Sequence, residues 1–234
     1  MHLGNAHFWD QPRSPSAPLP LSHRAKNLCM KDKQMTTITT IEALEALYEA
    51  PAQATLDKVQ DHLTPLYKNW IDGARFLVLS TVGPEGTDAS PRGDDGPVVK
   101  IQNPKTLLLP DWRGNNRLDS LRNIVRDPRI SLMFMVPGCK NVVRINGKAA
   151  LSTDASLLTQ FDKSGKAPTC VLLATIEEVY FQCAKAIMRS ALWTSGDESQ
   201  SVPTAGEFVR EQSEGFDAEA YDEGYADYAK TRMW

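Results

Sequence analysis

The stretch RFLVLSTVGPEGTDASPRGD, residues 75–94, decides the fold class. Residues 75–82 are mostly apolar and β-branched, as in a buried strand, and residues 83–86 (Gly-Pro-Glu-Gly) have the composition of a hairpin turn. Residues 87–91 then form the returning strand. Two strands joined this closely run antiparallel, because a parallel pair needs a long crossover connection.

Working outward, the chain alternates further strand-like segments with a few helical ones. Strands are expected at residues 97–102, 106–109, 129–136, 142–151 and 170–179, with Asn146-Gly147 bending the fourth of these. Helices are expected at residues 54–63, 65–71, 115–125, 154–161 and 183–192. Short connections favour an antiparallel sheet that closes into a small barrel, hence an α+β fold that is mainly antiparallel β.

Charge and composition divide the chain into three parts. Residues 1–34 are rich in proline, lack apolar periodicity and read as a flexible leader. Residues 196–234 hold ten acidic and three basic residues, a charge of −7, which leaves +4 on the remainder of a chain whose net charge is −3. We therefore expect a barrel domain over residues 35–195 and an acidic helical segment over residues 196–234.

Several function classes are disfavoured by what the chain lacks. His62 is the only histidine beyond the leader, and the four cysteines have no metal-ligand spacing, so nucleophilic hydrolase chemistry and a metal site are not expected. The apolar stretches are too short to cross a bilayer, and the first thirty or so residues contain no apolar signal core. We expect a cytoplasmic protein with no membrane partner, whose chemistry is supplied by a cofactor.

The first candidate site is Ser90-Pro91-Arg92-Gly93-Asp94, directly after the hairpin. The Arg92 guanidinium is a planar fork suited to a phosphate group, and Gly93 lets a ligand approach the backbone closely. The alternative is a solvated ion pair of Arg92 with a neighbouring aspartate.

The second candidate site is DWRGNNRLDSL, residues 111–121. A helix N-cap at Asn115 or Asn116 would place Arg117 and Ser120 on one helix face beside free backbone N–H groups, which suits a phosphate. Alternatively, the arginines of this region only solvate an amphipathic helix. A nucleic-acid partner is not expected, because aspartates interrupt the basic residues and the whole chain is acidic.

The third candidate site is EEVYFQCAKAIMRSALW, residues 177–193. Lys185 and Arg189 are four residues apart on one helix face, which Gln182 and Trp193 extend by a turn in each direction. Cations, an amide and an indole in one stripe suit a planar, anionic ligand. The alternative is a core helix whose basic side chains reach out to solvent.

Together these motifs carry a family resemblance. SPRGD, DWRGNNRLDSLRNI, LMFMVPG, VRINGKA and EEVYFQCAKAIMRSALW, in this order over residues 66–193, resemble the pyridoxamine 5'-phosphate oxidase-related, FMN-binding split-barrel family. The resemblance implies a six-stranded split β-barrel with flanking helices, a homodimer, and FMN at the subunit interface.

The resemblance also assigns roles to residues of this chain. It implies that the FMN phosphate is held by four polar residues, Arg92, Asn116, Arg117 and Ser120. It places Trp112 and Arg113 beside the ribityl chain or the ring. It implies that four residues of the partner subunit approach the FMN, namely Gln182, Lys185, Arg189 and Trp193.

The function implied is an FMN-dependent oxidoreductase acting on a small molecule, with oxygen or an organic compound as electron acceptor. The alternative from another class is a non-catalytic flavin- or haem-binding carrier or sensor. The acidic C-terminal segment departs from the basic, His-containing end typical of true pyridoxamine 5'-phosphate oxidases and would repel an anionic substrate. The resemblance therefore does not extend to vitamin B6 phosphate as substrate, and no catalytic residue is assigned.

Overall fold

The computed structural model describes residues 37–234, and residue contacts divide the chain into two compact units, Met1–Ala50 and Pro51–Trp234. The described part of the first unit contains one short helix, α1 (Ile41–Glu45), whose cap Thr40 accepts a hydrogen bond from the Ala43 amide. All other described elements belong to the second unit. The predicted leader lies outside the described residues, and the domain boundaries after residues 34 and 195 stay predictions.

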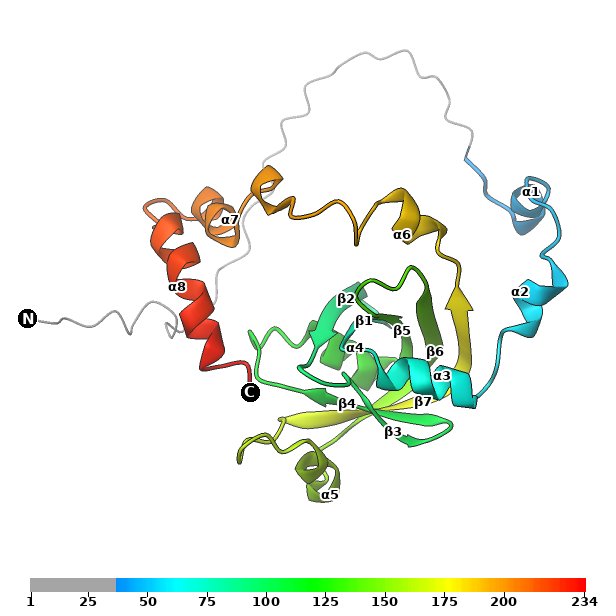
Figure 1. The fold of residues 1–234 in the computed structure, drawn as a ribbon, viewed down its shortest axis with the longest axis horizontal. Coiled ribbons are helices and arrows are strands. Elements are labelled where there is room, and N and C mark those ends of the chain that lie inside the picture. Colours follow the sequence, from blue (N-terminus) through cyan, green and yellow to red (C-terminus); the bar gives the residue numbers. More distant parts are fainter. Residues whose placement is uncertain (1–36) are drawn as a thin grey trace, which may run out of the picture. The chain divides into compact units, whose positions relative to one another are not determined.

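The second unit is built on one antiparallel sheet of seven strands in the order β2-β1-β5-β6-β7-β4-β3 (Figure 1). The strands are β1 (Phe76–Gly83), β2 (Gly86–Gly93), β3 (Lys100–Asn103), β4 (Thr106–Asp111), β5 (Arg129–Met135), β6 (Val142–Ser152) and β7 (Cys170–Gln182). The predicted α+β class with a mainly antiparallel sheet is confirmed. Each strand overlaps one of the predicted strand segments, and the sheet has one strand more than the six that the family resemblance implies.

The hairpin that decides the fold class forms as expected. β1 pairs with β2 from Phe76↔Gly93 to Gly83↔Gly86, and Gly86 has a φ of 132°, which a residue with a side chain rarely adopts. Leu77 and Leu79 are fully buried. Alternation along β1 therefore directs one face of the hairpin into the core.

The two long strands β6 and β7 give the sheet its split form. They pair along their whole length, but β5 borders only the half of β6 at residues 143–148, and β4 borders only the half of β7 at residues 170–175. The register shifts between Asn146 and Gly147, where the sequence predicts a bend. A β-bulge locally bends and twists its strand, so the β6–β7 pair can belong to both halves of the sheet.

Helix α4 (Asp119–Arg126) covers the β1–β2 hairpin and fixes the position of the loop before it. The buried Asn123 amide donates a hydrogen bond of 3.1 Å to the Thr81 hydroxyl of β1. Gly83 has no side chain, and a Cβ at this position would lie 2.2 Å from the side-chain amide oxygen Oδ1 of Asn123. The helix thus approaches β1 more closely than any other residue at position 83 would allow.

Three predicted helices differ from the observed ones. The predicted helix 54–63 forms only as α2 (Gln53–Asp57), before α3 (Pro65–Asp72). The predicted helix 115–125 begins at Asp119, because Asn116 and Leu118 have left-handed φ values of 58° and 63°. The predicted helix 183–192 is reduced to α6 (Lys185–Arg189), because β7 continues to Gln182 and Ala191 has a φ of 51°.

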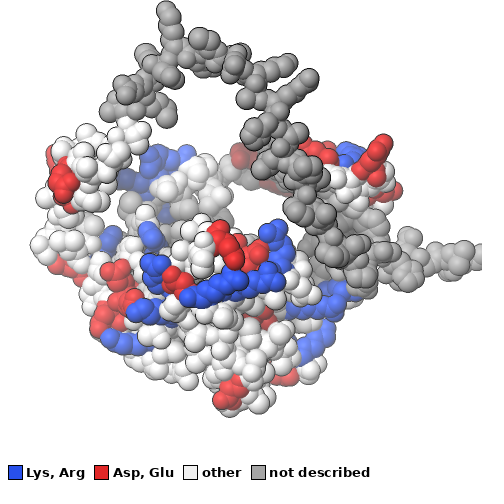
Figure 2. Space-filling model, turned by 180° about the vertical axis from the view of Figure 1, so that it is seen from behind, with Lys and Arg blue, Asp and Glu red and all other residues white. Residues whose placement is uncertain are grey.

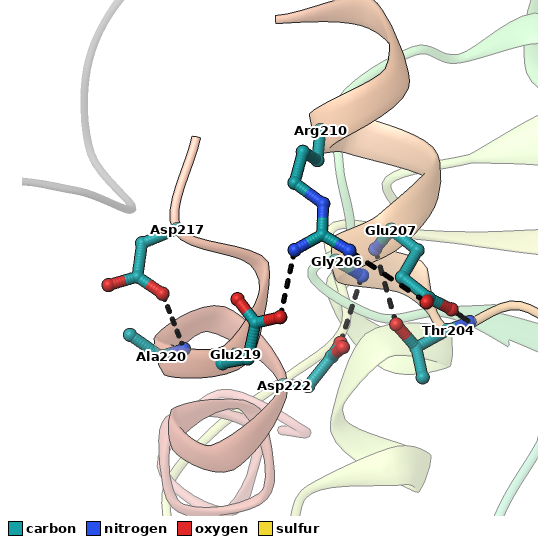
Figure 3. Close-up of polar contacts among 8 residues, drawn as sticks. All are labelled: Thr204, Gly206, Glu207, Arg210, Asp217, Glu219, Ala220 and Asp222. Atoms are coloured by element: carbon teal, nitrogen blue, oxygen red, sulfur yellow. Dashed lines mark hydrogen bonds and ion pairs between the residues drawn. The ribbon is translucent and has the colours of Figure 1, made fainter. Parts of the chain in front are cut away.

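The remaining short helices are α5 (Ala155–Leu158), η1 (Thr159–Phe161) and η2 (Ser199–Ser201), and the C-terminal segment ends in the helices α7 (Ala205–Gln212) and α8 (Ala218–Lys230). Figure 3 shows the polar contacts that join α7 to α8. Arg210 donates to Glu219 at 2.8 Å, and Asp222 accepts from the Gly206 amide at 2.9 Å. Within the described residues, none of the helices has the length and apolar character that crossing a membrane requires.

We predict that Gly147→Ala destabilises the sheet strongly. A Cβ at this position would lie 2.0 Å from the Thr175 carbonyl oxygen of the paired strand, so the backbone has to move. We expect the free energy of unfolding to fall by about 3 kcal/mol, as for overpacking at a site that cannot yield. Chemical denaturation of both variants measures it, with Gly96→Ala as control because that position has open space. An equal effect of both substitutions would contradict the prediction.

Candidate functional site

A pocket of about 710 Å³ lies where the end of β2, the end of β4 and the first turn of α4 meet. β2 contributes residues 88–93, and the chain leaving β4 contributes residues 109–118. Asp88, Ser90 and Arg92 are alternate residues of β2 and share its half-buried face. Strand periodicity thus places a carboxylate, a hydroxyl and a guanidinium in one row along the pocket wall.

The central polar contact of the pocket joins Arg92 to Asp111. The Arg92 Nη1 atom lies 2.5 Å from the Asp111 Oδ1 atom, and the two side chains are only 19% and 14% exposed. β2 and β4 are not neighbours in the sheet, so this ion pair bridges two separate parts of it. Arg92 therefore does not form the predicted solvated ion pair with a neighbouring aspartate, because its partner Asp111 lies across the pocket and the pair is largely shielded from solvent.

Two buried N–H donors of the pocket lack a hydrogen-bond partner within the described chain, Arg92 Nε and Trp112 Nε1. More than nine in ten buried polar groups are paired in folded proteins. Both donors belong to residues that line the same pocket, and a ligand with acceptor atoms that shifts these side chains slightly would give the donors partners. A cofactor that fits this pocket must therefore offer acceptor atoms to Arg92 Nε and Trp112 Nε1.

The loop between β4 and α4 presents the more exposed cations. Arg117 is 76% exposed and its Nε lies 2.8 Å from Asp119, while its backbone amide donates to the Asn115 side chain at 3.1 Å. That local hydrogen bond competes with helix formation, so neither Asn115 nor Asn116 acts as the N-cap. The N-cap is Leu118, whose side chain caps nothing. The prediction that Arg117 and Ser120 share a helix face was wrong, because Arg117 precedes the helix.

Ser120 lies in the first turn of α4 and is 4% exposed. Its hydroxyl donates a short hydrogen bond to the Asp88 carboxylate of β2. This contact ties the helix start to the pocket wall. Residues 118–121 line the pocket, so the N-terminal turn of α4 lies at its edge, where the positive end of the helix dipole favours an anion.

The charges that line the pocket are balanced. Three arginines, Arg92, Arg113 and Arg117, face three aspartates, Asp88, Asp111 and Asp119. Among the described residues, Arg113 makes no ion pair and is exposed. Figure 2 likewise shows basic and acidic side chains mixed in one band on the face seen from behind, without a patch of one sign.

A cysteine behind the pocket is not a nucleophile. Cys170 pairs with Asp111 in the β4–β7 ladder and is 8% exposed. Burial, with a further contribution from the Asp111 carboxylate, raises the pKa of its thiol, although Arg92 opposes the effect. The thiol therefore stays protonated near neutral pH, and its thiolate is not available for catalysis.

The structure brings together six of the ten predicted site residues in this pocket, namely Arg92, Trp112, Arg113, Asn116, Arg117 and Ser120. The other four lie elsewhere in the same chain. Gln182 ends β7 opposite Val142, Lys185 and Arg189 belong to α6, and Trp193 lies beyond that helix with its Nε1 donating 2.8 Å to the Cys139 carbonyl. The single helical stripe predicted for these four residues was wrong, because only two of them lie on the helix.

Sequence reasoning missed the acidic members of the pocket wall. Asp88 was detectable, since it alternates with Ser90 and Arg92 along a predicted strand. Sequence reasoning also missed Lys163, a cation next to the pocket-lining Trp112. It was not detectable, because its contact with the Trp112 ring joins positions that are far apart in the chain.

The comparisons with known proteins decide the family. The family model described as pyridoxamine 5'-phosphate oxidase matches residues 63–183, which is more than half of the chain. The chain belongs to this family. The matched region holds the whole sheet and the whole pocket of the family member described here. No curated protein matches the chain.

Solved structures of low identity also align with the chain. HupZ of Group A Streptococcus is 16% identical, with 50% of this chain and 91% of that one aligned and a TM-score of 0.42. General stress protein 26 of Bacillus anthracis is 19% identical, with 49% and 88% aligned and a TM-score of 0.36. A FAD-binding protein of Mesorhizobium loti is 15% identical, with 53% and 94% aligned and a TM-score of 0.36.

Proposed function

We propose that this family member is an FMN-dependent oxidoreductase, which transfers a hydride or an electron pair between a small molecule and oxygen or an organic acceptor. The observation that carries the proposal is the pair of orphan donors, Arg92 Nε and Trp112 Nε1, in a pocket that also presents two exposed arginines. An FMN molecule offers both the phosphate and the carbonyl acceptors that such donors require. The pocket volume lies in the range of small-molecule sites.

The residues present fit the phosphate end of FMN. Arg92 is held by Asp111 while its buried Nε lacks a partner. Arg113 and Arg117 are exposed and can turn toward an anion, Arg117 by leaving Asp119. Asn116 lies between them on the loop, and Ser120 fixes the start of α4. Together they would hold the phosphate, with Trp112 and Arg113 nearest the ribityl chain or ring.

The redox step would be supplied by the flavin, which exchanges a hydride or electrons without a protein nucleophile. The chain's own contribution would be to orient the cofactor and to stabilise charge on it. Asp111 and Asp119 keep Arg92 and Arg117 ordered before the ligand arrives, so less reorganisation is needed on binding.

We propose further that the protein acts as a homodimer in the cytoplasm, with Gln182, Lys185, Arg189 and Trp193 reaching the flavin of the partner subunit. Support comes from the apolar exposure around these residues. In the single chain, Met188 is 59% exposed, Leu192 is 45% exposed and Trp193 is 36% exposed. Large apolar side chains gathered outside a core are typical of a protein–protein contact.

An absorbance spectrum tests the cofactor. We expect the purified protein to show the two visible bands of an oxidised flavin, or to develop them with a shift when FMN is added and excess is removed. A colourless protein that leaves the FMN spectrum unchanged in titration would contradict the proposal. If the bound flavin reacts with reductants and acceptors no faster than free FMN does, the result would instead support the carrier alternative.

We predict that Arg117→Ala weakens FMN binding by about 1–2 kcal/mol, because an exposed, charge-assisted contact to the phosphate is lost. The side chain is 76% exposed, so the fold is not affected. Flavin fluorescence quenching measures the dissociation constant. Arg122→Ala is the matched control, an exposed arginine of α4 outside the pocket. Equal affinity of both variants would place the phosphate elsewhere.

A subunit-mixing experiment tests the composite site. We expect Arg189→Ala to weaken FMN binding like Arg117→Ala. In the proposed dimer, each site uses Arg117 of one subunit and Arg189 of the other. When the two variants are mixed and exchange subunits, both substitutions of a heterodimer therefore fall in the same site, and its second site has the wild-type residues. Biphasic FMN binding with one wild-type affinity is the expected result. Uniformly weak binding after verified subunit exchange would show that both arginines act within one chain.

A further inference from the structure

Lys163, in the turn after η1, lies beside the pocket among four groups from three distant segments. Its ammonium is 2.5 Å from the Asp95 carboxylate and makes a second, shorter contact with Asp94. It also lies 3.5 Å from the ring centroid of Trp234 and 5.9 Å from that of Trp112. The Lys163 side chain is 25% exposed, so these contacts are partly shielded from solvent.

The Lys163 ammonium keeps its positive charge because of its two carboxylate neighbours. Burial by itself lowers the pKa of Lys163, but hydrogen bonds to Asp94 and Asp95 outweigh it and raise the pKa above its usual value. Lys163 is therefore a cation throughout the neutral range. A cation over an indole face and between carboxylates is attracted to both.

Trp234 connects this cluster to the C-terminal helices. Its ring contacts the Trp112 ring edge-on, with centroids 5.4 Å apart and planes at 78°. It follows α8, which is joined to α7 by the Arg210–Glu219 ion pair and by the hydrogen bond from the Gly206 amide to Asp222 (Figure 3). The two helices are thus attached to the pocket through an aromatic contact at their end.

The cluster touches both walls of the pocket. Asp94 and Asp95 directly follow Gly93, the last pocket residue of β2, and the Asp94 amide is held by the Arg75 carbonyl at 3.0 Å. Trp112 follows Asp111, the pocket residue that ends β4. Lys163 therefore acts on the same two strand ends that the Arg92–Asp111 ion pair joins, but from outside the pocket.

We propose that Lys163 and Trp234 are positioning residues, a latch that fixes the Trp112 indole and the end of β2 for the ligand of the pocket. The inference rests on the proposed function only for the identity of that ligand, FMN. Neither residue lines the pocket, so each acts through Trp112 or through the Asp94-Asp95 segment. The C-terminal segment thereby becomes part of the binding site although its helices do not contact the ligand.

Four variants and one double variant test the latch. Lys163→Met keeps the length of the side chain and removes the charge, Trp234→Ala removes the ring, and Trp234→Phe keeps an aromatic ring. Lys166→Met is the matched control, an exposed lysine in the same turn. We expect Lys163→Met and Trp234→Ala each to weaken FMN binding about three- to tenfold, from the usual strength of cation–π and aromatic pair contacts.

The double variant separates a latch from two independent contacts. If Lys163 and Trp234 act as one unit, Lys163→Met combined with Trp234→Ala weakens FMN binding no more than either change alone. Trp234→Phe and Lys166→Met should bind FMN like the wild type. Additive losses, or wild-type affinity in both single variants, would overturn the proposal.

A readout without FMN keeps the latch distinct from the proposed function. Two indoles in close contact produce an exciton couplet in the far-ultraviolet circular dichroism spectrum. We expect Trp112→Phe to abolish the couplet of the wild type, Lys163→Met to diminish it, and Lys166→Met to leave it unchanged. If the wild type fails to bind FMN, the proposed function fails, and this couplet alone decides the latch. A couplet that Lys163→Met leaves intact would overturn it.

Discussion

The ion pair between Arg92 and Asp111 is the constraint on which the pocket depends. β2 stands at one end of the strand order and β4 near the other, so no ladder hydrogen bond joins them. The sheet curls far enough for the two strand ends to meet, and the 2.5 Å contact holds them there. A largely shielded pair of this kind costs desolvation, so its clearest effect is on geometry and less on stability. It orients a guanidinium into a pocket and leaves its Nε without a partner.

The balance of three arginines against three aspartates has a consequence for binding. An empty pocket lined only by cations would be destabilised by their mutual repulsion, and the aspartates remove that cost. Each carboxylate also holds a donor in place, as Asp88 does for Ser120 and Asp119 for Arg117. An incoming anion then competes with exposed carboxylates for Arg117 but not for Arg92 Nε, which is already desolvated. The buried donor therefore offers the more specific interaction.

The parts of the fold that were predictable from the sequence are those encoded within a few residues. Alternation and turn composition located the β1–β2 hairpin, and Asn146-Gly147 located the bend in β6. The start of α4 was mispredicted, because two left-handed residues one position apart, Asn116 and Leu118, are not detectable from composition. The site followed the same rule. Residues within one motif were found, whereas the Lys163–Trp234 contact depends on tertiary packing across the chain.

The net charge of the acidic C-terminal segment does not by itself determine the electrostatic field at the pocket. Several of its carboxylates are engaged internally, Glu207 and Glu219 with Arg210 and Asp222 with the Gly206 amide. Exposed charges act over about 8 Å at physiological ionic strength, so only the groups next to the pocket determine its local field. The residue of this segment that reaches the pocket wall is Trp234, an indole that carries the Lys163 cation on its face. The Lys163 cation on that indole is in turn paired with Asp94 and Asp95, so the cluster adds no net positive charge next to the pocket.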